Sequence, residues 1–132
     1  MNSASSGVYL AKARATLAGA ELELANGLYN NAVNRAYYAC YQAAVAALVA
    51  EGVSPAIDAY WPHDAVQVQF PELLIDQRGL YPRALRATLK ATFDERLQAD
   101  YEPLIVDPAT ATEAVRRARD FVGHIVAEAG SP

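Results

Sequence analysis

The segment from residue 31 to 50 limits the possible folds more than any other part of the chain. It reads NAVNRAYYACYQAAVAALVA and contains neither proline nor glycine. As a helix it is apolar on nearly every side, and such a helix is buried on every side. A chain of 132 residues is barely large enough to enclose one helix completely. We therefore expect part of this helix to meet a second copy of the chain, and a large charged residue in place of Ala44 or Ala47 to disrupt that dimer.

The rest of the composition fits one domain spanning residues 1–132, with residues 1–6 and 130–132 flexible. Hydrophobic residues make up 53% of the chain, which is enough for a core, and the net charge of −4 argues against indiscriminate DNA binding. The first residues do not resemble a secretory signal, and the apolar run 36–50 is shorter than the ~20 residues that cross a membrane. We expect a cytoplasmic protein without a membrane segment.

The chain has one cysteine, Cys40, and two widely spaced histidines, His63 and His124. One cysteine cannot form an internal disulfide, and its apolar surroundings predict a buried, inert thiol. These three residues do not have the spacing of metal ligands. The sequence therefore predicts neither a metal site nor a cofactor.

Apolar residues at steps of three and four predict further helices and no strands. The first runs over 6–26 and ends at Gly27 in a left-handed conformation. The second begins at Asn30 or Asn31, either of which can cap it. A third starts at Pro62 and is bent or interrupted by Pro71.

A fourth helix starts at Pro82, and the last is capped by Asp107 and opened by Pro108. Pro103 and Pro108 bracket the loop between these two helices. The sequence thus predicts an all-α chain of four or five helices.

Three motifs stand out along the chain: Gly27-x-Tyr29-x-x-Ala32-x-Asn34-Arg35-Ala36-Tyr37-Tyr38-Ala39, His63-x-x-Val66-x-x-x-Phe70 and Arg96-x-x-Ala99-Asp100-Tyr101. Together they resemble the HEPN domain family, in its branch of short stand-alone bacterial and archaeal proteins. The resemblance extends from about residue 8 to 126. Where family members often have Phe-His after the tyrosine pair, this chain has Tyr41-Gln42.

The resemblance implies an up-and-down bundle that forms a homodimer. Many HEPN proteins are partners of minimal nucleotidyltransferases in toxin–antitoxin pairs. Others cleave RNA with an Arg-x4-6-His motif, which the two copies of a dimer bring together at one cleft. In related pairs the nucleotidyltransferase modifies a tyrosine close to the signature arginine, which makes Tyr101 a candidate acceptor here.

Cleavage of RNA without a metal needs a group that moves a proton near neutral pH and a cation that holds the phosphate. Histidine and arginine suit these roles. The stretch from Arg96 to Tyr101 has a tyrosine where catalytic relatives have the histidine, and a phenol with a pKa of about 10 is a poor proton shuttle. One interpretation is a helix end with Arg96 paired to Asp100 or Glu102 and Tyr101 packed on the bundle. The other is a working cleft for RNA or a nucleotide.

Arg119 and His124 satisfy the family spacing literally. Five residues along a helix put them roughly 140° apart, on different faces. Only a kink at Gly123, or pairing across a dimer, would join them. Otherwise they are a surface arginine and a histidine near a helix end.

Arg35 is a charge on an otherwise apolar helix. It either forms an ion pair with Asp100 or Glu95, or lines a polar pocket with Tyr38 and Arg96. His63 could join that pocket in place of the missing histidine, or be a structural histidine.

A basic cluster around the fourth predicted helix is either a solvated face or a patch that follows phosphates. Three carboxylates, Asp76, Asp94 and Glu95, lie beside it. Its members are Arg78, Arg83, Arg86 and Lys90.

The leading hypothesis is a dimeric member of a toxin–antitoxin-like pair with a minimal nucleotidyltransferase, which binds RNA or a nucleotide at the dimer cleft. Whether the protein is itself an enzyme stays open. The rivals are a metal-independent endoribonuclease using Arg96 with His63 or Arg119 with His124, and a non-catalytic dimeric scaffold. The candidate catalytic residues are Arg96, Tyr101 and His63, and the candidate binding residues are Arg35, Tyr38 and Asp100.

Overall fold

The computed structural model describes residues 2–55, 60–101 and 105–130, and within them the chain is helical without a β-strand. A π-helix, η1, follows α3 directly, and a short 3-10 helix, η2, leads into α4. The helices are α1 (Asn2–Ala25), α2 (Tyr29–Ala50), α3 (His63–Gln69), η1 (Phe70–Gln77), η2 (Arg83–Ala87), α4 (Thr88–Tyr101) and α5 (Pro108–Ala129).

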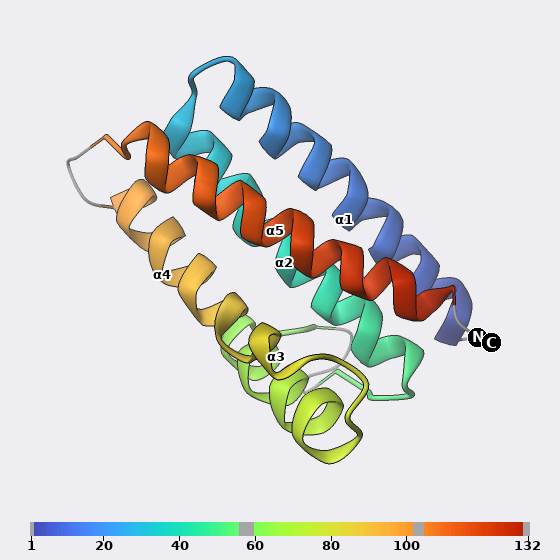
Figure 1. Cartoon of the computed structure of the whole chain (residues 1–132). Helices are drawn as coiled ribbons and strands as arrows, with labels where there is room; N and C mark the ends of the chain where they lie inside the picture. The colour runs from blue at the N-terminus through green and yellow to red at the C-terminus, as the bar shows by residue number, and fades with distance from the viewer. Residues whose placement is uncertain (1, 56–59, 102–104, 131–132) are drawn as a thin grey trace.

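Four long helices form an up-and-down bundle, as Figure 1 shows. α1 and α4 run in one direction along the bundle, and α2 and α5 run in the other. The shorter α3 and η1 pack across one end of α2. The first turns of α1 and the last turn of α5 meet at that same end of the bundle, where Ser6 and Ala129 line one pocket. The predicted all-α bundle is confirmed.

The central helix α2 is enclosed by its own chain over residues 43–49, whereas Arg35, Tyr38 and Tyr41 of the same helix are only partly buried. Seven consecutive residues, 43–49, are buried, and Ala44 and Ala47 are 0% and 3% exposed. α1, α4 and α5 all pack on α2, and α3 and η1 cover its last turns. The many alanines explain this, because small side chains let neighbouring helices come close from several directions. The prediction that Ala44 and Ala47 lie at a dimer interface is therefore wrong.

The predicted helix ends at Asp107 and Gly27 are confirmed. The Asp107 side chain accepts a hydrogen bond of 2.8 Å from the Thr110 amide, and Pro108 follows as the first residue of α5. Gly27 has a φ of 74°, a left-handed conformation that suits glycine, and it lies in the short turn between α1 and α2. α1 begins at Asn2, earlier than predicted.

The predicted asparagine cap of α2 is wrong, since the helix begins at Tyr29 and no side chain caps it. The side chain of Asn30 instead forms hydrogen bonds with two distant backbone groups. Its Nδ2 donates to the Ala99 carbonyl at 2.9 Å, and its Oδ1 accepts from the Val106 amide at 3.0 Å. This side chain thereby ties α2 to the end of α4 and to the segment that precedes α5.

Pro71 changes the third helix without ending it. The chain passes from α-helix to π-helix at Phe70, and Pro71 lies in the first turn of the π-helix. Proline has no amide hydrogen to continue the α-helical pattern. The wider hydrogen-bonding pattern of η1, such as the 3.1 Å bond from the Arg78 amide to the Leu73 carbonyl, accommodates it.

Cys40 is fully buried in α2, and burial raises its pKa to about 12. The inert thiol expected from the sequence is therefore what the fold provides. Within the described part of the chain, no cluster of three or more histidine, cysteine, aspartate or glutamate side chains is placed to hold a metal ion. No helix in these residues is long and apolar enough to span a membrane.

Candidate functional site

Arg96, in the third turn of α4, is a largely buried cation surrounded by aromatic rings. Its side chain is 14% exposed. The guanidinium carbon lies 5.4, 5.7 and 5.8 Å from the ring centres of Tyr38, Tyr37 and Phe93. A cation within about 6 Å of a ring centre is attracted by the electrons of the ring face. These rings therefore hold the guanidinium group in place where α4 packs on α2.

A second cation, Arg35, contacts the same Tyr38 ring, with its guanidinium carbon 5.0 Å from the ring centre. Its Nε and Nη2 donate to Asn34 Oδ1 at 3.0 and 2.7 Å. Asn34 Nδ2 in turn donates to Asp100 Oδ2 at 3.1 Å, and Arg96 Nε donates to the same oxygen at 3.2 Å. Asn34 and Asp100 thus connect the two arginines.

The expected partners of these arginines are partly corrected. Arg35 does not pair directly with Asp100 or Glu95, because Asn34 intervenes at the first and Glu95 binds Arg117 at 3.1 Å. Burial raises the pKa of Glu95, and the nearby Arg117 guanidinium partly offsets the effect. The ion pair of Arg96 with Asp100 is confirmed at 3.2 Å. The alternative partner, Glu102, lies outside the described residues.

His63, in the first turn of α3, lies among the tyrosines of α2. Its ring is stacked on Tyr41, with 4.4 Å between ring centres, and on Tyr37, with 5.5 Å. The Tyr38 ring is nearly perpendicular to the imidazole, with 5.8 Å between ring centres. The Tyr37 hydroxyl is hydrogen-bonded to His63 Nδ1. We refer to Arg35, Tyr37, Tyr38, His63 and Arg96 as the arginine–tyrosine cluster.

The surroundings of His63 favour its neutral form. Burial lowers its pKa, the Arg96 charge lowers it further, and Asp64 partly offsets both effects. Burial also raises the pKa of Tyr37, so its hydroxyl keeps its proton at neutral pH. A Tyr37 hydroxyl that donates to Nδ1 leaves the imidazole proton on Nε2. The cluster therefore combines two fixed cations with a neutral imidazole.

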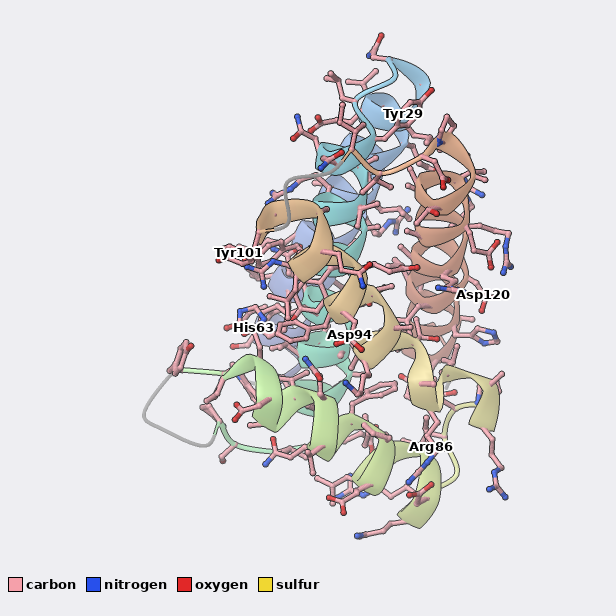
Figure 2. The ribbon with its side chains drawn as sticks, turned by 90° about the vertical axis from the view of Figure 1, so that its left-hand side faces the viewer. Tyr29, His63, Arg86, Asp94, Tyr101 and Asp120 are labelled. Carbon is pink, nitrogen blue, oxygen red and sulfur yellow. The ribbon has the colours of Figure 1, made fainter. Side chains whose placement is uncertain are left out.

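Tyr101 is 73% exposed at the end of α4, so the expectation that it packs against the bundle is wrong. It has no hydrogen bond or ring contact with any residue in the described ranges. It follows Arg96 by five positions, which puts the two about 140° apart around the helix. In the view of Figure 2, Tyr101 and His63 lie along the same edge of the molecule. Tyr101 therefore lies outside the arginine–tyrosine cluster, with its side chain accessible.

Arg119 and His124 do not meet. α5 continues through Gly123 as an α-helix. Arg119 Nε binds Glu21 Oε2 of α1 at 2.7 Å, whereas His124 Nε2 lies 3.6 Å from Asp120 Oδ1, one turn earlier in α5. Within one chain, Arg119 and His124 therefore lie on different faces of α5, as their spacing predicted.

The basic cluster around α4 is largely neutralised. Arg78 binds Glu51 at 3.2 Å and Lys90 binds Asp94 at 3.1 Å. Arg86 pairs with Asp76. Arg83 is exposed and forms no ion pair with a described residue. An open groove of about 730 Å³ runs past Arg83, Arg86 and Lys90, and Figure 2 labels Arg86 and Asp94 along it. Pairing of these basic side chains with carboxylates is what a solvated face of a helix would have.

The candidates drawn from the sequence omitted Asn34, Tyr37, Tyr41 and Phe93. Spacing offered a signal for three of them: Tyr37 and Tyr41 are four residues apart on one helix face, and Phe93 precedes Arg96 by three. Nothing in the sequence indicated that Asn34 would bridge to a residue 66 positions away. Gln42, at the position of the missing family histidine, accepts a 2.8 Å hydrogen bond from Thr16 of α1 and so faces away from His63.

Comparison with protein families gives one match. A family model described as HEPN domain matches residues 7–128, which include every residue of the arginine–tyrosine cluster. A comparison with curated proteins gave no match.

Proposed function

Because the chain belongs to the HEPN domain family, we propose that it is a dimeric protein that binds RNA or a nucleotide at the arginine–tyrosine cluster, paired with a minimal nucleotidyltransferase in a toxin–antitoxin-like system. HEPN domains are in general related to RNA and nucleotides. The observation that carries the proposal is the contact of two guanidinium groups, those of Arg35 and Arg96, with the single ring of Tyr38.

The chemistry of this cluster suits a nucleotide. Guanidinium groups bind phosphate oxygens in pairs, and aromatic faces stack on bases of any sequence. Tyr38 is only partly buried, so part of its ring is accessible. Asp100 fixes Arg96 through one oxygen at Nε, which leaves the terminal nitrogens of that guanidinium for a phosphate. Arg35 is held by the amide oxygen of Asn34 rather than by a carboxylate, through its Nε and Nη2, which leaves its Nη1 for a phosphate.

A dimer would place two such clusters at one cleft. HEPN domains commonly dimerise. Since Ala44 and Ala47 are buried within their own chain, the interface does not include them, and the rim of the cluster is our choice. Tyr60 and Tyr101 are 58% and 73% exposed, and Tyr60 is close enough to Tyr41 to influence its pKa. Exposed aromatic rings of this kind are typical of protein interfaces.

Tyr101 is the proposed acceptor for the nucleotidyltransferase. Transfer would form a bond between the phenol oxygen and the α-phosphorus of a nucleoside triphosphate, break the bond to the β-phosphate and release pyrophosphate, with the phenol proton passing to a base of the transferase. Such a step needs an exposed hydroxyl, and Tyr101 meets that need better than the buried Tyr37. Attachment at Tyr101 would add a phosphate to the end of the helix that carries Arg96.

RNA binding can be tested by fluorescence anisotropy with a labelled 12-nucleotide single-stranded RNA at several salt concentrations. We expect Arg35→Gln and Arg96→Gln each to weaken binding about tenfold, as loss of a charged hydrogen bond does. Each should also reduce the slope of log K against log salt by about 0.7. Arg116→Gln, which removes an exposed arginine of α5, is the matched control. Equal binding by all four proteins would contradict the proposal, and no salt-dependent binding at all would favour a docking scaffold.

The acceptor role is tested separately. The chain is co-expressed with the product of its neighbouring gene, which the proposal requires to be a minimal nucleotidyltransferase, and intact mass is measured. We expect the mass to increase by one or more nucleotidyl groups in the wild type and to stay unchanged in Tyr101→Phe. An unmodified wild type, or a Tyr101→Phe variant that is still modified, would count against Tyr101.

The rival function, a metal-independent endoribonuclease, is favoured by the position of His63. Its imidazole contacts two of the tyrosines that also contact Arg96. A neutral imidazole can remove the proton of a 2′-hydroxyl, whose oxygen then attacks the adjacent phosphorus. The bond to the 5′-oxygen breaks, that oxygen takes up a proton from the imidazolium just formed or from water, and a 2′,3′-cyclic phosphate remains, while arginine stabilises the charge. RNA incubated with excess chelator should be cleaved by the wild type and not by His63→Ala or Arg96→Ala. Cleavage that survives both substitutions would exclude this site.

A further inference from the structure

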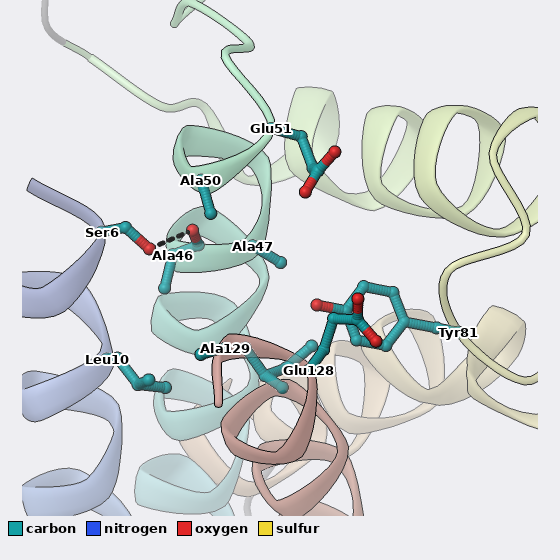
Figure 3. Close-up of a pocket in the computed structure, with 10 residues that line it drawn as sticks. Ser6, Leu10, Ala46, Ala47, Ala50, Glu51, Tyr81, Glu128 and Ala129 are labelled. Atoms are coloured by element: carbon teal, nitrogen blue, oxygen red, sulfur yellow. Dashed lines mark hydrogen bonds between the residues drawn. The ribbon is translucent and has the colours of Figure 1, made fainter. Parts of the chain in front are cut away.

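A pocket of about 270 Å³ opens where the first turns of α1 meet the last turns of α2 and α5, as Figure 3 shows. One of its walls is apolar and consists of small side chains. That wall is formed by Ala46, Ala47 and Ala50 of α2, with Leu10 and Ile125 beside them. The opposite wall carries a phenol and two carboxylates, those of Tyr81, Glu51 and Glu128. The pocket lies away from the arginine–tyrosine cluster and shares no residue with it.

The Tyr81 hydroxyl is the first indication of a ligand. Tyr81 is 8% exposed, and its hydroxyl forms no hydrogen bond with any residue that the structure describes. The ring packs on Phe70, and Figure 3 shows the hydroxyl pointing between α2 and α5 into the pocket. The ring of Tyr81 is buried, but its hydroxyl is not among the fully enclosed polar atoms of the described residues that have no partner, so it borders the open space of the pocket. A bound group that donates or accepts at this position would supply a partner.

The charge of the polar wall is the second indication. Glu51 is paired with Arg78 at 3.2 Å, whereas Glu128 has no hydrogen bond or ion pair within the described ranges. Both carboxylates are close enough to Tyr81 to add to the effect of burial in raising its pKa. The pocket therefore has an excess negative charge beside a hydroxyl that stays protonated. An anionic ligand would be repelled here.

We propose that this pocket binds a primary alkylammonium cation. The three N–H groups of the ammonium would donate to Glu128, to Glu51 and to the Tyr81 oxygen, and the alkyl chain would lie on the alanine wall. The volume corresponds to about nine water molecules, which suits a chain of four to six non-hydrogen atoms. A divalent metal ion fits less well, because Mg²⁺ and Ca²⁺ require six or more oxygen ligands and the wall facing them is hydrocarbon.

The test is a titration of the full chain with n-butylammonium chloride, followed by the amide shifts of residues 46–51 and 125–129 in two-dimensional NMR. We expect saturable shifts in the wild type, and binding about tenfold weaker in Glu128→Gln and in Tyr81→Phe. Glu72→Gln, which changes an exposed carboxylate of η1, is the matched control and should bind as the wild type does. 1-Butanol has the same chain without the charge and should bind at least tenfold more weakly.

Two further arms identify the source of the amine. Binding of 1,4-diaminobutane with no binding of Nα-acetyl-lysine amide would assign the pocket to free amines. Equal binding of the blocked lysine would assign it to a lysine side chain of another protein, and both results support the ammonium site. Equal binding by 1-butanol and butylammonium, or equal affinity in Glu128→Gln and Glu72→Gln, would overturn it. None of these measurements involves RNA, so the outcome is independent of the function proposed above.

Discussion

The hydroxyl of Tyr37 in α2 is hydrogen-bonded to Nδ1 of His63 in the first turn of α3. This bond connects the central helix of the bundle to the segment that crosses its end. It also orients the imidazole, and when the Tyr37 hydroxyl donates, Nδ1 is the acceptor and Nε2 carries the proton. The environment that lowers the pKa of His63 and the one that raises the pKa of Tyr37 have the same first cause, burial.

The lowered pKa of His63 predicts a loss of stability in acid. The unfolded chain has a histidine pKa near 6.5, above that of the folded protein, so it binds the proton more tightly. As pH falls from 7.5 through 6.5 to 5, protonation therefore favours unfolding. The His63→Gln variant lacks this effect, and its free energy of unfolding in urea should gain relative to the wild type as pH falls. A difference between the two proteins that is the same at pH 7.5 and 5 would refute the prediction.

Asn30 should matter for stability and its neighbour Asn31 should not. Asn30→Ala removes the partners of the Ala99 carbonyl and the Val106 amide, and partly buried backbone groups left unpaired cost about 1–3 kcal/mol. Asn31 is exposed, so Asn31→Ala is a matched control with the same change in the same turn. Urea unfolding followed by circular dichroism measures both. Equal stability of the two variants would mean that the Asn30 bonds are replaced by water.

Ala44→Glu should unfold the chain rather than only separate a dimer. Ala44 is completely buried among helices of its own chain, and an unpaired buried charge costs roughly 3–5 kcal/mol. Ala15→Glu, on the exposed face of α1, should leave the thermal midpoint nearly unchanged. Circular dichroism and size-exclusion chromatography together distinguish the outcomes. An Ala44→Glu variant that keeps its helical signal and elutes as a monomer would restore the interface that the sequence suggested.

Cys40 should be unreactive until the fold opens. With a pKa of about 12 and complete burial, almost none of the thiol is ionised or accessible at pH 8. Ellman's reagent should therefore react with one thiol per chain in urea and with almost none in buffer. Rapid reaction in buffer would show that α2 is exposed on the timescale of the measurement.

The sequence predicted those parts of the fold that depend on neighbours in the chain. Asp107 and Pro108 mark the start of α5 because a cap and a first-turn proline act within one turn. The start of α2 could not be found in this way, because Asn30 uses its side chain on residues 69 and 76 positions away. The neighbours of α2 were misjudged because a hydrophobic pattern indicates that a helix is buried but does not indicate which segments cover it.

The candidate site was likewise predicted where it depends on the residue pattern and missed where it depends on distant contacts. Arg35, Tyr38, Arg96 and His63 lie together, as one of the two interpretations of the sequence required. The hydrogen bonds through Asn34 that link the arginines depend on the packing of α4 against α2. The spacing of residues along the chain could not predict them. One of the two interpretations of the sequence had Tyr101 packed against the bundle. It is exposed because a five-residue step carries it off the face that Arg96 occupies.

The way in which α5 covers α2 has a consequence for synthesis of the chain. Translation adds about 5–20 residues per second, and α5 begins about 60 residues after α2 ends. The hairpin of α1 and α2 is therefore made several seconds before its last cover. During that interval one apolar side of α2 faces solvent on the nascent polypeptide. At this stage a chaperone, or the unfinished chain on a neighbouring ribosome, can bind a surface that the finished protein buries.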